Sequence, residues 1–246
     1  MQKTLLLLVV SFFVGRNCQA QNLVPNPSFE IHSDCPDNLD QVYKATGWNS
    51  FYSSPDYFSS CSSTHVNVPM NDFGFEFAAE GNSYCGFYSF YSFLQLINYR
   101  EYLGRELATT LISGNKYYVS IKISLANVGN CATNNIGVLF STVQPSDSSI
   151  NCFLHDHAQV NSSFIINDTS NWNIISGSFI ADSSYKYIVI GNFFHDALTD
   201  TIVYDGNHCS AYYYIDDVCV SPDSLACDLN PEGIYNLKET KASINL

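Results

Sequence analysis

Two histidines that flank an aspartate are the residues best suited to metal or catalytic chemistry: His155, Asp156 and His157. Residues two positions apart lie on one face of a strand, so the two imidazoles could bind one metal ion. A third ligand would have to come from a distant part of the chain, with His195 or His208 as candidates. Nothing in the sequence fixes that distance, and polar loop residues next to a disulfide are the favoured interpretation.

Other catalytic patterns are weak. A serine hydrolase of the nucleophile-elbow type needs Gly-x-Ser-x-Gly, which does not occur in the sequence. A glycosidase needs two carboxyl groups on either side of a glycosidic bond, but a chain with 23 Asp and Glu residues always offers such a pair. The sequence therefore predicts a protein that is not an enzyme.

Aromatic residues indicate binding more strongly, because the chain holds 17 tyrosines and sugar rings stack on aromatic faces. The alternative is that they fill the core, as most aromatic residues do in a β-sandwich. Trp48 and Trp172 are expected to pack in this way. The candidates for a stacking platform are Tyr52, Tyr57, Tyr84, Tyr88, Tyr91 and Tyr99.

Residues 1–20 are typical of a secretion signal, with Lys3, an apolar run and a small residue, Ala20, at the expected cleavage point. The apolar run is too short to span a bilayer. We expect a secreted chain that begins at Gln21, with a lipid anchor at Cys18 as a less favoured alternative. The segment 228–246 lacks cysteines and is expected to be a tail or linker.

Eight cysteines follow the expected signal, and an even number in an exported chain predicts disulfides. Cys219 and Cys227 flank a Ser-Pro-Asp turn, which favours their pairing. No Cys-x-x-Cys motif occurs, so a zinc ribbon or a thioredoxin-like site has little support. The expected pairs are Cys219 with Cys227, Cys131 with Cys152, Cys35 with Cys61, and Cys85 with Cys209.

Charge and composition limit the fold and its partners. The net charge of −13 repels phosphate backbones and anionic membranes, so nucleic acid is not an expected partner. Few Lys and Arg residues and many Asn, Ser, Tyr and Phe residues favour strands and turns over helices. About 226 residues after the signal can form one sizeable core.

Several segments alternate apolar and polar residues or run continuously apolar, as strands do. We expect 99–108 to pair with 117–126 across the turn at Gly114 and Asn115. The expected strands do not alternate with helical segments, as they would in a parallel α/β fold. This predicts an all-β antiparallel sandwich. The further expected strands are 84–93, 134–141, 172–181, 185–194 and 211–220.

Short motifs along the chain carry a family resemblance. "VPNPSFE", "PDYF", "YREYL", "GNKYYVSIKISLA", "WNIISGSFIA" and "YYIDDVCV" occur in this order. The chain resembles the galactose-binding-like jelly rolls of carbohydrate-binding modules. It looks more closely like the N-terminal module of secreted surface proteins of gliding-type bacteria, which are type IX secretion relatives. The resemblance implies a jelly roll over residues 21–227 and a non-catalytic binding role.

The same resemblance implies a structural Ca²⁺ ion between the first and last strands. Its ligands would be Glu30, one of Asp216 and Asp217, and backbone carbonyls. Alternation along a strand places the two aspartates on opposite faces, so only one would be a ligand. The alternative is that Glu30 accepts a surface hydrogen bond and the aspartates end a strand.

The partner that we expect is a glycan or surface polysaccharide at the bacterial cell surface, or a surface protein bound in adhesion. A purely structural spacer is the main alternative, and a hydrolase acting on glycans is third. Members of the resembled group usually continue into a sorting domain. Here "KASINL" lies about where that domain would begin.

Overall fold

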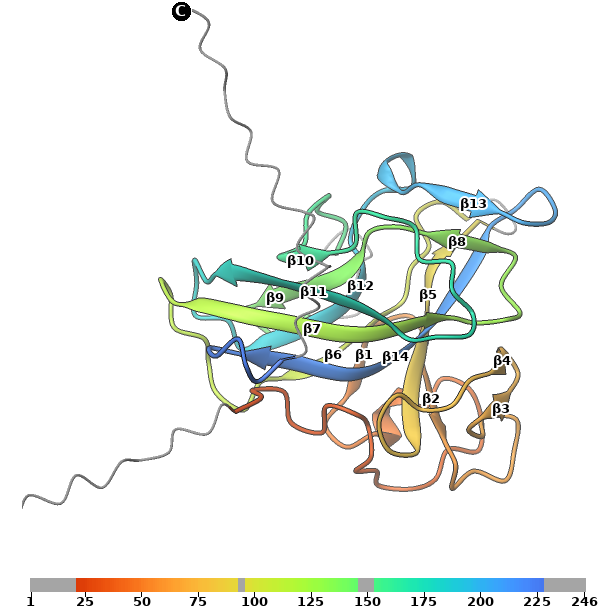
Figure 1. Cartoon of the computed structure of the whole chain (residues 1–246), viewed down its shortest axis with the longest axis horizontal. Coiled ribbons are helices and arrows are strands. Elements are labelled where there is room, and N and C mark those ends of the chain that lie inside the picture. The colour runs from red at the N-terminus through yellow and green to blue at the C-terminus, as the bar shows by residue number, and fades with distance from the viewer. Residues whose placement is uncertain (1–20, 93–95, 146–152, 228–246) are drawn as a thin grey trace, which may run out of the picture.

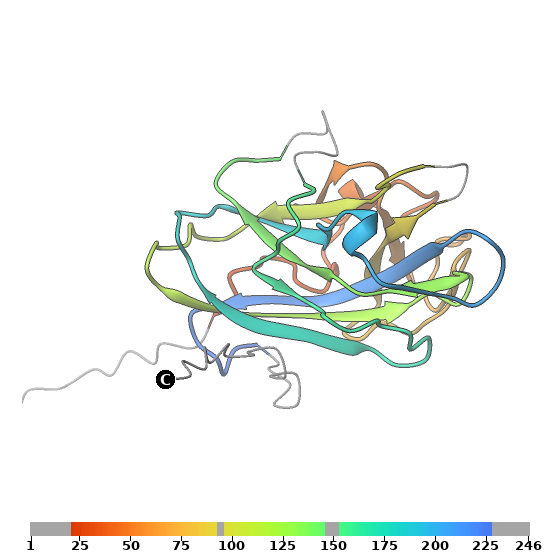
Figure 2. The same cartoon turned by 90° about the horizontal axis from the view of Figure 1, so that it is seen from above.

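The computed structural model describes residues 21–92, 96–145 and 153–227. Two five-stranded antiparallel sheets pack face to face (Figures 1 and 2). The first sheet has the order β1 (Asn49–Tyr52), β6 (Tyr102–Glu106), β12 (Tyr187–Asn192), β9 (Ile136–Ser141) and β10 (Val160–Asn161). The second has the order β11 (Asn173–Ile180), β7 (Lys116–Leu125), β14 (Ser210–Ser221), β5 (Ser83–Tyr91) and β2 (Asp56–Ser59).

Two short two-stranded sheets lie at different places on this sandwich (Figure 1). One joins β8 (Cys131–Thr133) to β13 (Thr201–Val203), and the other joins β3 (Met70–Asn71) to β4 (Gly74–Phe75). Two 3-10 turns complete the described elements, η1 (Val42–Lys44) and η4 (Asp196–Leu198). Within the described ranges, no helix is long and apolar enough to cross a membrane.

From β5 onward the main strands alternate between the two sheets. β5, β7, β11 and β14 belong to the second sheet, whereas β6, β9 and β12 belong to the first. The expected all-β, antiparallel jelly-roll sandwich is therefore confirmed. Figure 2 shows the two sheets as separate layers.

The expected hairpin between 99–108 and 117–126 is wrong. β6 pairs with β1 and β12, and β7 pairs with β11 and β14. The connection between them is long enough to cross from one layer to the other, and it buries Leu107 and Leu111 in the main core. The burial of these leucines outweighs the local tendency of neighbouring strands to pair.

Strand β14 shows why many tyrosines pack inside the protein. Tyr213 and Ile215 belong to the core between the sheets, while Tyr212 and Tyr214 face the other side. That outer face is covered by segment 65–78, whose Phe73 ring stacks on Tyr212 with centroids 3.6 Å apart. Around β14, β5 and β2 the second sheet is therefore buried on both faces.

Three disulfides are present among the described residues. Cys35–Cys61 and Cys219–Cys227 confirm two expected pairs. The third joins Cys131 to Cys209, so the expected pairs Cys131–Cys152 and Cys85–Cys209 are wrong. The reason is that β8 lies beside the start of β14, whereas Cys85 is buried inside β5 as a free thiol. Cys152 lies outside the described residues.

The first and last described segments lie side by side. The Leu23 amide donates a 2.7 Å hydrogen bond to the Val220 carbonyl, and the Val218 amide donates one of 3.0 Å to the Pro27 carbonyl. The Asn22 side chain bridges the same segments, since it donates to Val218 and accepts from Val220. Both ends of the domain are thus joined by backbone and side-chain hydrogen bonds.

Candidate functional site

A cavity of about 320 Å³ opens where β2 and β5 meet the segment that leads into β6. This volume lies at the lower end of the roughly 300–1,000 Å³ that is common for small-molecule sites. Three of its walls are tyrosines that the sequence singled out. We name this cavity the tyrosine pocket; it is lined by Leu39, Asp40, Ser54, Asp56, Phe73, Tyr88, Tyr91, Leu96, Tyr99 and Glu101.

Three half-buried tyrosine rings stand against one another at this pocket. Tyr88 and Tyr91 lie on β5, and Tyr99 forms an antiparallel bridge with Tyr91. The ring centroids are 5.0 Å apart for Tyr88 and Tyr91 and 5.6 Å apart for Tyr91 and Tyr99, with interplanar angles near 60°. Edge-to-face packing of this kind fixes the rings while each hydroxyl keeps a polar end.

The segment that carries Tyr99 is held from behind by η4. Asn98 and Asp196 exchange two 2.8 Å hydrogen bonds, each from the backbone amide of one residue to the side chain of the other. The fully buried Arg100 forms a 2.9 Å ion pair with Asp196 and donates to the Tyr99 carbonyl. The position of Tyr99 in the pocket therefore depends on the ion pair between fully buried Arg100 and half-buried Asp196.

Glu101 is the first of two buried carboxyl groups in the pocket, with only 2 % of its surface exposed. One oxygen accepts a 2.9 Å hydrogen bond from the Tyr88 amide, and the other accepts from the hydroxyls of Ser54 and Tyr99, both at 3.1 Å. Burial raises the pKa of Glu101 to about 7, although these hydrogen bonds lower it in part.

Asp56, at the start of β2, is the second buried carboxyl group and is 3 % exposed. Its oxygens accept hydrogen bonds from the Asp40 amide at 2.7 Å and from the Tyr212 hydroxyl at 2.5 Å. Burial raises the pKa of Asp56 to about 7, with a smaller contribution from the nearby charges of Glu101 and Asp40, although the hydrogen bonds from Tyr212 and the Asp40 amide lower it in part. The tyrosine pocket therefore combines aromatic rings with two desolvated carboxyl groups.

The remaining candidate tyrosines lie elsewhere. Tyr84 is fully buried and its hydroxyl donates to the Glu76 carbonyl, so its ring is not available to a ligand. Tyr57 is also fully buried, whereas half-buried Tyr52 packs against Tyr102 and Phe153 on the first sheet. Trp48 is buried in the main core and half-buried Trp172 packs against the second cluster.

Sequence reasoning missed both carboxyl groups of the pocket. Glu101 follows Tyr99 by two positions, and Asp56 opens the short strand "DYFS". An acidic residue within an aromatic strand pattern is a signal that could have identified them. Burying a carboxylate is costly, so its presence in such a strand indicates a specific role.

His155, Asp156 and His157 are all exposed and do not form a metal centre. Asp156 instead accepts a 2.8 Å hydrogen bond from the imidazole of His195 and a second one from the His195 amide, which lower the pKa of Asp156. His155 and His157 line a larger cavity of about 580 Å³, together with exposed Asp182. We name this the histidine cavity; its two histidines and Asp182 are exposed, unlike Asp56 and Glu101 of the tyrosine pocket.

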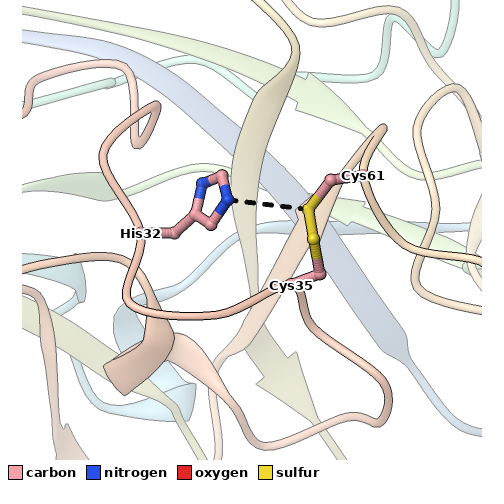
Figure 3. Close-up of side chains that lie close together, drawn as sticks. All are labelled: His32, Cys35 and Cys61. Carbon is pink, nitrogen blue, oxygen red and sulfur yellow. Dashed lines mark hydrogen bonds between the residues drawn. A yellow bond between two sulfur atoms is a disulfide. The ribbon is translucent and has the colours of Figure 1, made fainter.

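One close group of three potential metal ligands occurs among the described residues: His32, Cys35 and Cys61. Figure 3 shows the His32 imidazole pointing toward the Cys35–Cys61 disulfide, with Nε2 3.8 Å from the Cys61 sulfur. Metal ions bind the thiolate form of cysteine, which a disulfide does not provide. In its oxidised form this group is a structural crosslink beside a histidine.

The carboxylates expected to hold calcium divide into two environments. Glu30 and Asp216 both approach the loop 79–82, since Glu30 accepts from the Asn82 amide at 2.8 Å and Asp216 accepts from the Glu80 amide at 3.0 Å. Asp217 instead forms a 2.7 Å ion pair with Lys122. Burial raises the pKa of Asp216 to about 8. Glu30 and Asp216 thus converge on one loop, and Asp217 lies apart.

Comparison with known proteins gives structural likeness alone. No protein-family model matches the chain, and no curated protein matches it. The CBM22-1 xylan-binding domain of Xyn10C from Paenibacillus barcinonensis is similar over 82 % of this chain and 94 % of its own, at 11 % identity and a TM-score of 0.43. A xylan-binding domain from CBM 22 is similar over 80 % of this chain and 96 % of its own, at 11 % identity and a TM-score of 0.37. The tailspike protein 4 of bacteriophage CBA120 is similar over 81 % of this chain and 21 % of its own, at 10 % identity and a TM-score of 0.37.

Proposed function

We propose that the protein is a non-catalytic glycan-binding domain and that the tyrosine pocket is its binding site. The observation that supports this is the meeting of half-buried Tyr88, Tyr91 and Tyr99 with buried Asp56 and Glu101 in one cavity. The apolar face of a sugar ring packs on aromatic rings, and its hydroxyls pair with fixed oxygen acceptors.

Binding is proposed in preference to hydrolysis because the carboxyl oxygens already accept hydrogen bonds from donors within the protein. Asp56 accepts from Tyr212 and the Asp40 amide, and Glu101 accepts from three protein donors. A general acid and base must reach the glycosidic oxygen and a water molecule. Carboxyl groups fixed behind the tyrosines are better suited to orienting hydroxyls than to transferring protons.

A glycan array followed by calorimetry on the retained oligosaccharides tests the proposal. Tyr91→Ala should reduce the affinity for those oligosaccharides about two- to tenfold, because a stacked aromatic ring contributes on the order of 0.5–1.5 kcal/mol. Tyr52→Ala is the matched control, since Tyr52 is also half-buried but packs on the first sheet. Silence across the array would favour the structural-spacer alternative.

We propose that the domain acts outside the cell, at the bacterial surface, where it retains a surface polysaccharide or a partner protein in adhesion. The signal-like segment 1–20 and the three disulfides support an oxidising compartment. Fractionation of cells followed by detection of the disulfide-bonded protein tests this location, and protein found only in the cytosol would contradict it.

We further propose a structural Ca²⁺ ion at the junction of the first and last segments, with Glu30 and Asp216 as side-chain ligands. The donors fit a hard cation, because both are carboxylates that approach the same loop, and Asp216 is fully buried. Calcium there would compensate a charge that is costly to bury. Asp217 is excluded as a ligand in this proposal by its pairing with Lys122.

A further inference from the structure

We propose that the tyrosine pocket selects glycans that carry a protonated amine, that is, amino sugars without an acetyl group on the nitrogen. This inference rests on the proposed glycan-binding function and names the class of sugar. It follows from the charge, the aromatic walls and the donor–acceptor balance of the cavity.

The first argument is the charge of the cavity. Three of its ten lining residues are acidic, Asp40, Asp56 and Glu101, and none of the ten is Lys, Arg or His. Arg100 lies between the pocket residues Tyr99 and Glu101 in the sequence, but its guanidinium pairs with Asp196 of η4. A carboxylate buried without a cation pays a large desolvation cost, which a cationic ligand would offset.

The second argument is the chemistry of the walls. Tyr88, Tyr91 and Tyr99 present ring faces and edges at interplanar angles of 60° to 67°. An ammonium group close to the face of a tyrosine ring is attracted by the negative charge of the π-system. Aromatic walls with an acidic floor therefore suit a sugar that is apolar on one face and positively charged at one substituent.

The third argument is the balance of donors and acceptors. The carboxyl groups of Asp56 and Glu101 are acceptors when ionised, and an ammonium group brings three donors and no acceptor. An acetylated amine brings a single N–H donor, a carbonyl oxygen and a methyl group to the same place. The carbonyl oxygen of the acetyl group would face carboxylate oxygens, which is repulsive.

The net charge of the chain acts in the same direction. At −13, the protein attracts cationic polymers over distances beyond direct contact. This general attraction weakens with salt, whereas contacts inside a desolvated pocket persist. Salt dependence can therefore separate selection by the pocket from non-specific attraction.

Calorimetry with two oligosaccharides of equal length tests the inference. The glucosamine trimer and the N-acetylglucosamine trimer differ only in the acetyl groups. At pH 7, where a substantial fraction of both carboxyl groups is ionised, and at 150 mM salt we expect the glucosamine trimer to bind at least about tenfold more tightly to the wild-type protein. Glu101→Gln and Asp56→Asn should each reduce that preference at least about threefold, because both keep the side-chain shape and remove the charge. Asp182→Asn, in the histidine cavity, is the matched control for a lost surface charge and should keep the preference.

Each outcome has a distinct meaning. If the N-acetylglucosamine trimer or a neutral oligosaccharide from the array binds equally well, selection of amines is wrong while the glycan site stands. If no oligosaccharide binds, both proposals fail. If Asp182→Asn lowers the affinity for the glucosamine trimer as much as Glu101→Gln does, the attraction is non-specific and the inference is overturned. The comparison of the two trimers on the wild-type protein needs no variant to fold.

Discussion

The carboxyl group of Asp56 on β2 accepts a 2.5 Å hydrogen bond from the hydroxyl of Tyr212 on β14, across the intervening strand β5. The tyrosine ring can take this path because residue 86 of β5, directly opposite Asp56, is a glycine. A Cβ atom at Gly86 would collide with the Tyr212 ring and hydroxyl. One glycine thus allows a core tyrosine to support the floor of the tyrosine pocket.

Gly86→Ala should lower the free energy of unfolding by about 1–3 kcal/mol, because extra volume in a packed region forces the neighbouring side chain to move. Urea denaturation measures this change. Gly177→Ala on β11 of the same sheet is the control, since its new Cβ would meet only methyl groups of Val160 at 3.1 Å. Equal losses in the two variants would show that the Tyr212 contact has no special role.

The ion pair between fully buried Arg100 and half-buried Asp196 should contribute more to stability than the pair between Lys122 and Asp217. Arg100→Met leaves half-buried Asp196 without its cation and should cost about 1–3 kcal/mol of unfolding free energy. Lys122→Met breaks the partly exposed pair with Asp217 and should cost about 0–1 kcal/mol. Chemical denaturation of both variants checks the ranking, and a reversed ranking would contradict the role given to Arg100.

Stability should fall as the pH rises from about 4 to about 8. Burial raises the pKa of Asp56 and Glu101 to about 7 and that of Asp216 to about 8, so between these values and their ordinary values the folded state binds more protons than the unfolded state. Each group can contribute up to about 1.4 kcal/mol per pH unit in this window. The relevant measurement is urea denaturation at pH 5, 6, 7 and 8 in the presence of a chelator.

The variant Asp56→Asn should make this pH slope shallower because it removes one of the buried carboxyl groups that titrate in this range. Asp182→Asn should leave the slope unchanged, since Asp182 is exposed. A wild-type protein that grows more stable from pH 5 to pH 8 in chelator would rule out the raised pKa values of the buried carboxyl groups.

Chelation should lower the melting temperature of the wild-type protein if Ca²⁺ joins Glu30 and Asp216. Glu30→Gln should melt at the same temperature with and without Ca²⁺, because the variant lacks one ligand charge. Asp217→Asn is the control and should keep the calcium response, since Asp217 pairs with Lys122. A wild-type melting temperature that does not respond to Ca²⁺ would contradict the proposed calcium site.

The Cys85 thiol should be inert in the folded protein. It is fully buried on β5, and burial together with the nearby charges of Asp216 and Asp56 raises its pKa well above the ordinary value. Alkylation followed by peptide mass spectrometry should label Cys85 only after unfolding. Labelling of Cys85 in the native protein at the rate of an exposed thiol would contradict its placement.

The sandwich could be predicted from the sequence because its strands are marked locally. β7 alternates Val119, Ile121 and Ile123 toward the core, and β14 contains a long aromatic run. The pairing of β6 could not be predicted in the same way. β6 pairs with β1 and β12, which lie in the same sheet but are distant from it in the sequence.

The candidate site was predictable only in part. Tyr88, Tyr91 and Tyr99 come from one stretch of sequence, and Tyr91 and Tyr99 form an antiparallel bridge. Asp56 reaches them through the pairing of β2 with β5, which joins positions some thirty residues apart and leaves no local mark. The disulfide Cys131–Cys209 could not be predicted for the same reason, because its two cysteines meet only once both sheets are assembled.

A crystal structure of the protein soaked with the oligosaccharide that binds best on the array tests the central claim most directly. The account predicts a sugar ring against Tyr88, Tyr91 and Tyr99, with a substituent directed toward Asp56 or Glu101. A sugar bound in the histidine cavity beside His155 and His157, with the tyrosine pocket empty, would contradict it.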